Sequence, residues 1–407
     1  MIELRGSSWH HERGHAPMVA TAAEYERLTG GAVRIRWEPR SLKDFGVASV
    51  EDLARDYDLV VIDHPHIGLI AETGCAVPLD EIPDLSGGFG GVVPPGGSRA
   101  PGDLAALGAG SPGRSHQSYH YGGRQWALAV DAACQVSARR PDLLPEPPGR
   151  WDEVLELSRH GRVLWPLGDV DSAASLLTLL AGLGHPVTFA DGHVIDRAAA
   201  LEALGLMREV ARGGDPRCLS MNPINVLDTL SSADDFWYAP LTFGYLNYSR
   251  AGHPGRRLAF GDIPRIGAGP EPAGSLLGGA GLMISAYRPH RAEAAGYALH
   301  VAASATQRTT YLAAGGQPAH HDVWADPVAD EASGGFFSGT GRTMAASWTR
   351  PRTPGFVRFQ NEMIELFGDH GRWMSEPGPF LDDLDAIYRR RGSVRRPDPD
   401  GKRYSAD

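Results

Sequence analysis

The sequence predicts an α/β fold with a ligand site at the tips of its strands, and three observations support this prediction. First, residues 59–62 form a continuously apolar, largely β-branched run, as expected of a strand buried on both faces of a sheet. Second, this run ends in the polar string Asp63-His64-Pro65-His66, and open α/β sheets bind ligands outside the carboxyl ends of their strands. Third, strand and helix patterns alternate along the chain.

Composition limits both the architecture and the class of function. The 407 residues are 42% hydrophobic, which predicts two or three domains with ordinary hydrophobic cores. The net charge of −10 argues against nucleic acid as a partner, because nucleic-acid binding usually needs a basic surface. Cys75, Cys134 and Cys218 are far apart and predict free thiols. No stretch approaches the ~20 apolar residues that span a bilayer, so we expect no membrane insertion.

The first residues run directly into a strand pattern, without the cationic start and apolar run of a signal peptide. We therefore expect a cytoplasmic location. The alternative is that a leader has been removed, in which case the protein works outside the cytoplasm.

The first 62 residues predict a βαβαβ unit. Residues 2–7 are the first strand and residues 8–15 a loop, after which Pro17 is expected to open a helix that closes at Gly30-Gly31. Residues 33–37 alternate as a second strand, and Ser49 with Asp52 resembles a capping box before a short helix. The loops after the three strands gather along one rim.

The middle of the chain predicts a second α/β unit. Residues 86–114 are rich in glycine and proline and predict a long loop, and residues 125–131 form an extended segment. A helix is expected from Trp151, followed by a strand at residues 163–165. Asp171 is expected to cap the apolar helix that follows, and Asp196 to cap another.

The last part of the chain continues the alternation. An aromatic-rich segment at residues 236–248 precedes a strand at 258–263, a glycine-rich turn and a strand at 282–285. Helices are then expected from Pro289 and at residues 306–314. The final expected elements are helices near 356–367 and 380–388, and a polar tail.

The order of these elements resembles the extracellular solute-binding proteins of carbohydrate ABC transporters, the maltose-binding-like proteins with a type II periplasmic-binding-protein fold. The similarity extends over about residues 2–370. Its marks are Trp9 after the first strand, the strand entering Asp63, Trp151-Asp152-Glu153 after Pro147-Pro148, Gly278-Gly279 after Pro264, and residues 292–303 leading to Gln307 and Gly315-Gly316-Gln317-Pro318.

This resemblance implies two α/β lobes, each a mixed sheet flanked by helices, with hinge strands between them. The first lobe would comprise residues 1–122 and 275–325, and the second residues 123–274 and 326–407. Residues 125–131 and 258–276 would form the hinge. A carbohydrate or sugar-like solute would bind in the cleft and be trapped by hinge closure. No cofactor is implied, and an ABC permease is an expected partner only if the protein is exported.

Strand-tip positions and the resemblance together give candidate ligand-binding residues in both lobes. Aromatic faces can stack on sugar rings, while polar side chains bind the hydroxyl groups. Trp126 and Tyr245 are equally compatible with core positions, and Asp131 and Asp169 with turn or helix caps. The candidates are Trp9, His10, Arg40, Asp63, His64, His66, Gly279 and Gln317 in the first lobe, and Trp126, Asp131, Asp169, Tyr238 and Tyr245 in the second.

A second hypothesis is a cytoplasmic enzyme on the same fold. The tip beyond residue 62 carries more titratable groups than sugar binding requires, so His64 or His66 could perform acid/base chemistry with Asp63 as the orienting carboxylate. A lyase, isomerase or cyclase reaction fits these groups better than hydrolysis, because the sequence contains no Gly-x-Ser-x-Gly nucleophile motif. The scattered histidine pairs show no helical metal-binding pattern, and we expect no metal.

Overall fold

The computed structural model describes residues 1–82, 104–189, 195–267 and 273–392. Seven strands form one continuous mixed sheet in the order β2-β1-β3-β9-β6-β7, with β8 paired to β6. A separate hairpin joins β4 (His120–Tyr121) to β5 (Arg124–Gln125). The strands of the large sheet are β1 (Ile2–Trp9), β2 (Val33–Arg40), β3 (Leu59–Ile62), β6 (Leu128–Arg139), β7 (Tyr238–Phe243), β8 (Ala259–Gly261) and β9 (Leu277–Ile284).

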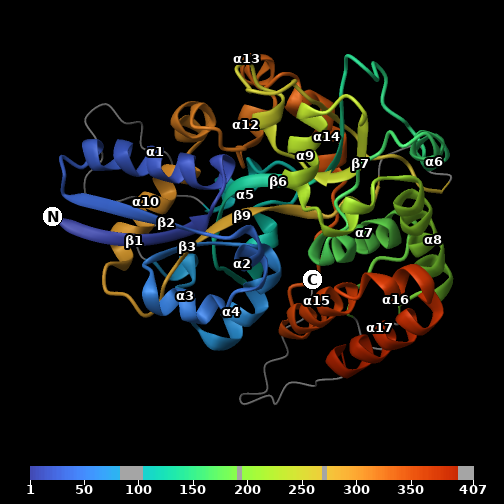
Figure 1. Ribbon diagram of the computed structural model, residues 1–407. Helices are drawn as coiled ribbons and strands as arrows, with labels where there is room; N and C mark the ends of the chain where they lie inside the picture. Colours follow the sequence, from blue (N-terminus) through green and yellow to red (C-terminus); the bar gives the residue numbers. More distant parts are fainter. Residues whose placement is uncertain (83–103, 190–194, 268–272, 393–407) are drawn as a thin grey trace.

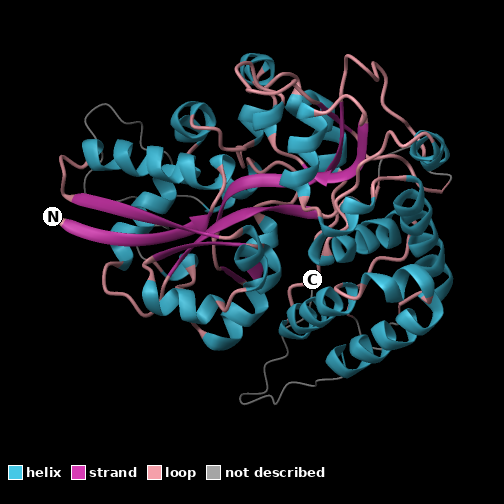
Figure 2. Cartoon of the chain, in the orientation of Figure 1, coloured by secondary structure: helices cyan, strands magenta, loops and turns pink. Residues whose placement is uncertain are grey.

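The long strand β6 carries the chain from one half of the molecule to the other. Its residues from Leu128 to Cys134 pair with β9, and those from Gln135 onward pair with β7 and β8. Strands β1, β2 and β3 are parallel, whereas β9 runs antiparallel to both β3 and β6. The sheet is therefore continuous across the expected hinge, rather than divided into one separate sheet per lobe (Figure 2).

Helices flank the N-terminal half of the sheet on both faces. In Figure 1, α1 (Glu12–Leu28) lies on the opposite side of β1 and β2 from α3 (Val50–Asp56) and α4 (Ile67–Thr73). Helix α10 (Arg291–Ala302) returns to this half and packs against α1 and β9. Buried residues such as Leu4, Met18 and Tyr297 form the hydrophobic core of this half of the molecule.

The other half is mainly helical. Helix α15 (Pro354–Phe367) packs against α7 (Asp169–Gly182), and α17 (Pro377–Gly392) packs against α8 (Arg197–Gly213) (Figure 1). These helices share one hydrophobic core, which includes Leu176, Leu204 and Phe359. A third buried cluster includes Ile62, Trp126 and Phe336. The remaining helices are α2 (Leu42–Val47), α5 (Leu104–Ala109), α6 (Trp151–Arg159), α9 (Pro223–Ser232), α11 (Ser304–Thr306), α12 (His321–Trp324), α13 (Pro327–Ala332), α14 (Phe336–Ala345) and α16 (His370–Ser375).

The largest difference from the sequence prediction is the start of α1. The helix begins at Glu12, so Pro17 lies inside it rather than opening it. The His11 side chain caps the helix by accepting a hydrogen bond from the Arg13 N–H at 3.0 Å. Histidine is not among the usual capping residues, so this earlier start could not be predicted from capping preferences. As a consequence, Arg13 lies on a helix instead of in a loop.

Several other boundaries also differ. The predicted strand at residues 163–165 contributes only an isolated bridge between Val163 and Tyr238. Helix α7 begins at Asp169 with Gly168 as its N-cap, so Asp171 does not cap it. Most of the predicted loop at residues 86–114 lies outside the described residues, and within its described part residues 104–109 form helix α5 instead of a loop. The residue boundaries of the two lobes stay a prediction.

Candidate ligand-binding site

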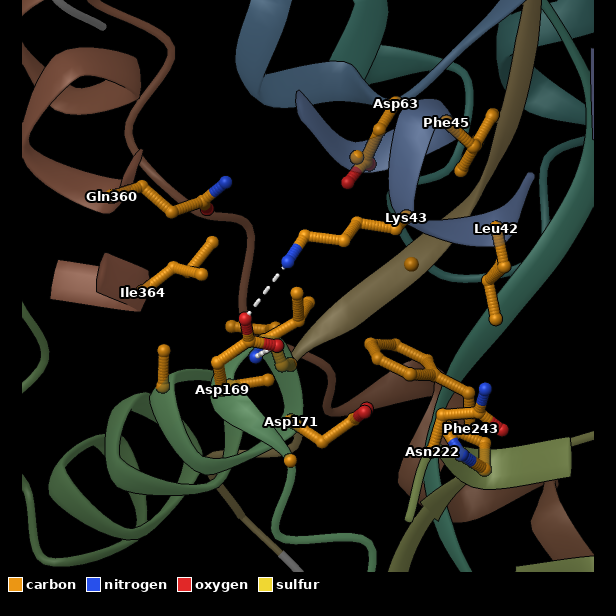
Figure 3. A pocket seen from close by; sticks show the side chains of 18 of the residues that line it. Leu42, Lys43, Phe45, Asp63, Asp169, Asp171, Asn222, Phe243, Gln360 and Ile364 are labelled. Carbon is orange, nitrogen blue, oxygen red and sulfur yellow. Dashed lines mark hydrogen bonds and ion pairs between the residues drawn. The ribbon is translucent and has the colours of Figure 1, made fainter. Parts of the chain in front are cut away.

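A cavity of about 290 Å³ lies where the two halves of the molecule meet. Residues of β1, α1 and α2 line one side of it, and the start of α7 lines the opposite side (Figure 3). The chain segments that complete its wall are residues 220–223, residues 243–245, residues 276–279 and the region from Arg350 to Ile364. The cavity thus draws its wall from segments far apart in the sequence.

Four aromatic side chains form part of this wall. They are Trp9, Phe45, Phe243 and Tyr245. The rings of Trp9 and Phe45 pack with their centroids 5.0 Å apart. The indole Nε1 of Trp9 is buried and has no hydrogen-bond partner among the described residues. Flat aromatic faces beside polar groups suit a small molecule with both apolar and hydroxyl-bearing surfaces.

A buried ion pair between Arg13 and Asp131 lies at the cavity wall. Arg13 lines the cavity, and its guanidinium binds the Asp131 carboxylate with an Nε–Oδ2 distance of 2.9 Å. Its Nη1 also donates to the carbonyl of Gly244 at 2.6 Å. The same guanidinium lies 4.7 Å from the centroid of the Tyr245 ring. Arg13 therefore holds α1, β6 and the segment after β7 together beside the cavity.

A second ion pair crosses from the β3 tip to the C-terminal region. Arg350 Nη2 donates to Asp63 Oδ2 at 2.6 Å, and Arg350 Nη1 donates to Gln360 Oε1 at 2.9 Å. Burial raises the pKa of Asp63, but the charge of Arg350 and the hydrogen bond from His64 outweigh it. The pKa of Asp63 is therefore below its usual range, and the carboxylate is ionised at neutral pH.

A third ion pair spans the cavity itself. Lys43 on α2 donates to Asp169 Oδ2 at 3.1 Å, and Asp169 is the first residue of α7 (Figure 3). Both side chains are partly solvent-exposed, so the pair contributes little to stability. Its position matters more than its strength, because it links the two halves across the opening.

Asp171 also lines the cavity, from the first turn of α7. Only 7% of the residue is exposed. Burial, with a further contribution from the nearby Asp169, raises the pKa of the Asp171 carboxyl well above its usual range. The cavity wall thus contains an aspartate that sequence analysis had assigned to helix capping.

Five of the predicted ligand-binding residues lie together in the cavity wall: Trp9, Asp63, Asp169, Tyr245 and Gly279. Gly279 has a φ of 92°, which favours glycine, and a Cβ there would collide with the Asp131 carbonyl. Whether these residues touch a ligand stays a prediction.

The other non-histidine candidates lie outside the wall, and most have internal partners. Asp131 lies behind it, paired to Arg13. The Arg40 guanidinium binds Ser7 Oγ at 2.9 Å and the Val61 carbonyl. Gln317 Nε2 donates to the Ala132 carbonyl at 2.7 Å. The remaining two, Trp126 and Tyr238, are buried in hydrophobic clusters.

None of the three predicted histidines lines the cavity, although Asp63 beside them does. His10 is exposed, whereas His64 is fully buried, with its Nδ1 3.1 Å from Asp63 Oδ1. Burial, followed by the charge of Arg350, lowers the pKa of His64 to about 4. His66 is buried with Nε2 3.2 Å from the Gly46 carbonyl. These contacts place His64 and His66 in the interior, away from the space where a substrate would bind.

Sequence reasoning missed several residues of the wall. Lys43 and Phe45 lie on α2, in the turn and helix that follow β2, whereas the candidate chosen at this strand end was Arg40, the last residue of β2. Arg13 was placed in a loop because the start of α1 was misjudged. Arg350 and Gln360 lie in the C-terminal part of the chain, and no local pattern marks them.

Two further kinds of feature, a metal-binding cluster and a membrane-spanning helix, do not occur in the described residues. They contain no group of three or more histidine, cysteine, aspartate or glutamate side chains arranged to hold a metal ion. Within the same ranges, no helix is long and apolar enough to cross a membrane.

The architecture is that of the two-lobed periplasmic-binding-protein type, as predicted from the sequence. Similar solved structures include many sugar-binding proteins of ABC transporters, whose fold this chain shares. A solute-binding protein from Agrobacterium radiobacter K84, in complex with ribitol, superposes with a TM-score of 0.77 at 16% identity, over 96% of this chain and 98% of its own.

Two further structures agree closely in fold. The GacH receptor of Streptomyces glaucescens GLA.O, solved unliganded and with acarbose, has a TM-score of 0.76 at 14% identity, over 97% of this chain and 99% of its own. Maltose-bound MalE3 of T. maritima has a TM-score of 0.75 at 15% identity, over 96% and 99% of the two chains. Neither a family model nor a curated protein sequence matches the chain.

Proposed function

We propose that the protein binds a carbohydrate or another polyhydroxylated small molecule in the cavity between its two halves. The observation that carries this proposal is the cavity wall, in which four aromatic rings lie beside the polar groups of Arg13, Asp63 and Asp169. Rings of this kind suit the C–H faces of a sugar or polyol, while carboxylates and guanidinium groups bind hydroxyls. The shared fold of proteins solved with ribitol, tagatose and maltose supports the same class of ligand.

Ligand exchange through an opening between two halves fits a binding protein that closes around its solute. The Lys43–Asp169 pair, which spans the cavity, is part of this proposed closed arrangement. An ABC permease is the proposed partner, and this role places the protein on the outer face of the cytoplasmic membrane. Cell fractionation of the native host, followed by detection with a specific antibody, tests that location.

Thermal unfolding of the whole chain in the presence of sugars and polyols tests the binding proposal. A ligand at about 100 times its Kd stabilises the folded state by about 2.7 kcal/mol, which raises the Tm by a few degrees for a chain of this size. We expect such a rise with at least one member of a panel containing ribitol, tagatose, maltose and acarbose. Unchanged melting with every sugar and polyol tested would contradict the proposal.

The variant Phe45→Ala is expected to weaken binding of that ligand about twofold to tenfold, because an aromatic contact contributes about 0.5–1.5 kcal/mol beyond its buried area. Phe45 is only partly buried, so the fold should tolerate its loss. Tyr287→Ala is the matched control, since Tyr287 is an exposed aromatic residue outside the cavity. Titration calorimetry on both variants provides the comparison. Equal affinities for the wild type and Phe45→Ala would show that α2 does not contact the ligand.

A further inference from the structure

Asp171 is the starting point for an inference about the chemical class of the ligand. Its side chain leaves the first turn of α7 toward the side of the cavity that holds Phe243 and Asn222 (Figure 3). The residue is more than nine-tenths buried, yet the described part of the chain provides no hydrogen-bond or ion-pair partner for its carboxyl group. The carboxyl oxygens are not among the fully buried atoms, so they open to the cavity, where a ligand can supply the partner that the described residues do not provide.

The other charged side chains of the cavity wall already compensate one another. Each has an opposite charge within ion-pair distance. These pairs are Arg13 with Asp131, Lys43 with Asp169, and Arg350 with Asp63. When Asp171 is ionised, the cavity therefore carries one negative charge more than the described residues neutralise. A ligand with a single positive charge would restore the balance.

The groups that face Asp171 do not supply this charge. On its own helix, Asp169 is a like charge, and the ammonium of Lys43 is engaged with that residue. From the opposite wall, Tyr245 is uncharged at neutral pH, since burial raises the pKa of its phenol to about 12. The guanidinium of Arg13 beside that ring is engaged with Asp131. The positive end of the α7 dipole favours an anion here but is only a partial charge.

We propose that the solute is a sugar or polyol that carries a protonated amine, and that its ammonium group forms an ion pair with Asp171. This inference rests on the proposed function and makes it more specific. A neutral hydroxyl group can hydrogen-bond with the protonated carboxyl group of Asp171, but it does not compensate the negative charge of the ionised form. An ammonium group neutralises the charge, and the neighbouring faces of Phe243 and Tyr245 attract cations as well.

The proposed ion pair makes binding of the amine depend on pH. In the free cavity the pKa of Asp171 is raised, so the carboxyl group takes up its proton at a higher pH than an ordinary aspartate does. The incoming ammonium group needs the ionised form, so binding displaces that proton. Affinity for an amine ligand should therefore fall as the pH is lowered, while affinity for a neutral sugar should change little. Calorimetry in buffers of different ionisation enthalpy measures the released proton directly.

The main test compares ligands that differ only in the amine. Titration calorimetry on the whole chain is run with D-glucose against D-glucosamine, and with D-glucitol against D-glucamine. We expect the amine to bind at least about tenfold more tightly in one or both pairs, because hydrogen bonds to charged groups are the stronger class. N-acetyl-D-glucosamine, which keeps the nitrogen but loses its charge, should lose this advantage.

The variant Asp171→Asn should abolish the preference for the amine, so that the amine and its neutral partner bind this variant with similar affinities. Its Tm without ligand should equal or exceed that of the wild type, because the amide resembles the protonated carboxyl group in shape and charge. Asp152→Asn on α6 is the control for net charge, since the Asp152 side chain is 78% exposed and does not line the cavity. This variant should keep the wild-type preference.

The outcomes separate this inference from the broader proposal. If the hydroxyl compounds bind as tightly as their amine partners, or if Asp171→Asn keeps the preference, the inference is overturned and sugar binding stands. If none of these compounds binds but a sugar or polyol of the thermal-unfolding panel does, the inference alone is overturned; if no compound of either set binds, both are overturned.

Discussion

Replacing Arg13 by methionine is expected to lower the free energy of unfolding by about 3–5 kcal/mol, because the substitution leaves the carboxylate of Asp131 buried without its partner. The two side chains are only 5% and 0% exposed. Methionine fills much of the volume of the aliphatic stem, so the expected loss comes from the stranded charge rather than from a cavity. Urea unfolding followed by circular dichroism measures the difference.

Two further variants show whether the pair itself is responsible. Arg36→Met removes a pair with Glu3 whose side chains are 63% and 42% exposed, and it should cost at most about 1 kcal/mol. The double variant Arg13→Met with Asp131→Leu removes both charges and should recover most of the stability lost in the single variant. A loss below about 1 kcal/mol for Arg13→Met alone would contradict the interpretation of this pair as a buried, compensated charge.

The fold was predictable because its signals are local. The apolar run at residues 59–62 is indeed a strand with all four residues buried, and the helix expected from Trp151 begins there. The alternation of such elements determines which layers can form. The start of α1 was not predictable in the same way, since it depends on a histidine cap that becomes apparent only when the helix is folded.

Residues of the candidate site could be predicted from the sequence only where they lie at the ends of strands. Trp9 closes β1 and Asp63 follows β3, and both line the cavity. Asp171 shows the limit of this reasoning, because an aspartate near the start of a helix has the same sequence signature whether it caps the helix or faces a cavity. Burial and the absence of a partner in the described residues separate the two cases, and both are properties of the folded chain.

Interaction partners that are far apart in the sequence are even harder to predict from it. Arg350 is 287 positions from Asp63, and nothing in the residues around it marks it as the partner of a strand tip. The sequence led instead to the adjacent histidines as partners of Asp63. The structure places His64 against Asp63 as well, but buried within the protein rather than facing the cavity.

The variant Arg350→Met is expected to destabilise the protein by about 3 kcal/mol at neutral pH, at the lower end of the range for a broken buried pair, because part of Asp63 reaches solvent. The pH dependence of this loss is the more informative result. In the wild type the pKa of Asp63 lies below its unfolded value, so its contribution to stability is present above about pH 4 and is lost as the pH falls further.

Without Arg350, the effect that raises the pKa of Asp63 is expected to outweigh the effects that lower it. Burial, which raises the pKa of this carboxyl group, is then opposed only by the weaker effects of His64 and His66. A group with a raised pKa destabilises the folded state when ionised and ceases to do so once protonated. The deficit of Arg350→Met relative to the wild type should therefore be largest at neutral pH and should shrink as the pH approaches about 4.

Unfolding of both proteins in urea across this pH range measures the deficit at each pH. Arg358→Met on α15 is the matched control, because Arg358 forms only a long, exposed pair with Glu72 at 3.7 Å. Its deficit should be small and nearly constant with pH. If the deficit of Arg350→Met were equally constant, the guanidinium would act through packing alone. The charge of Asp63 would then need another partner in the cavity wall.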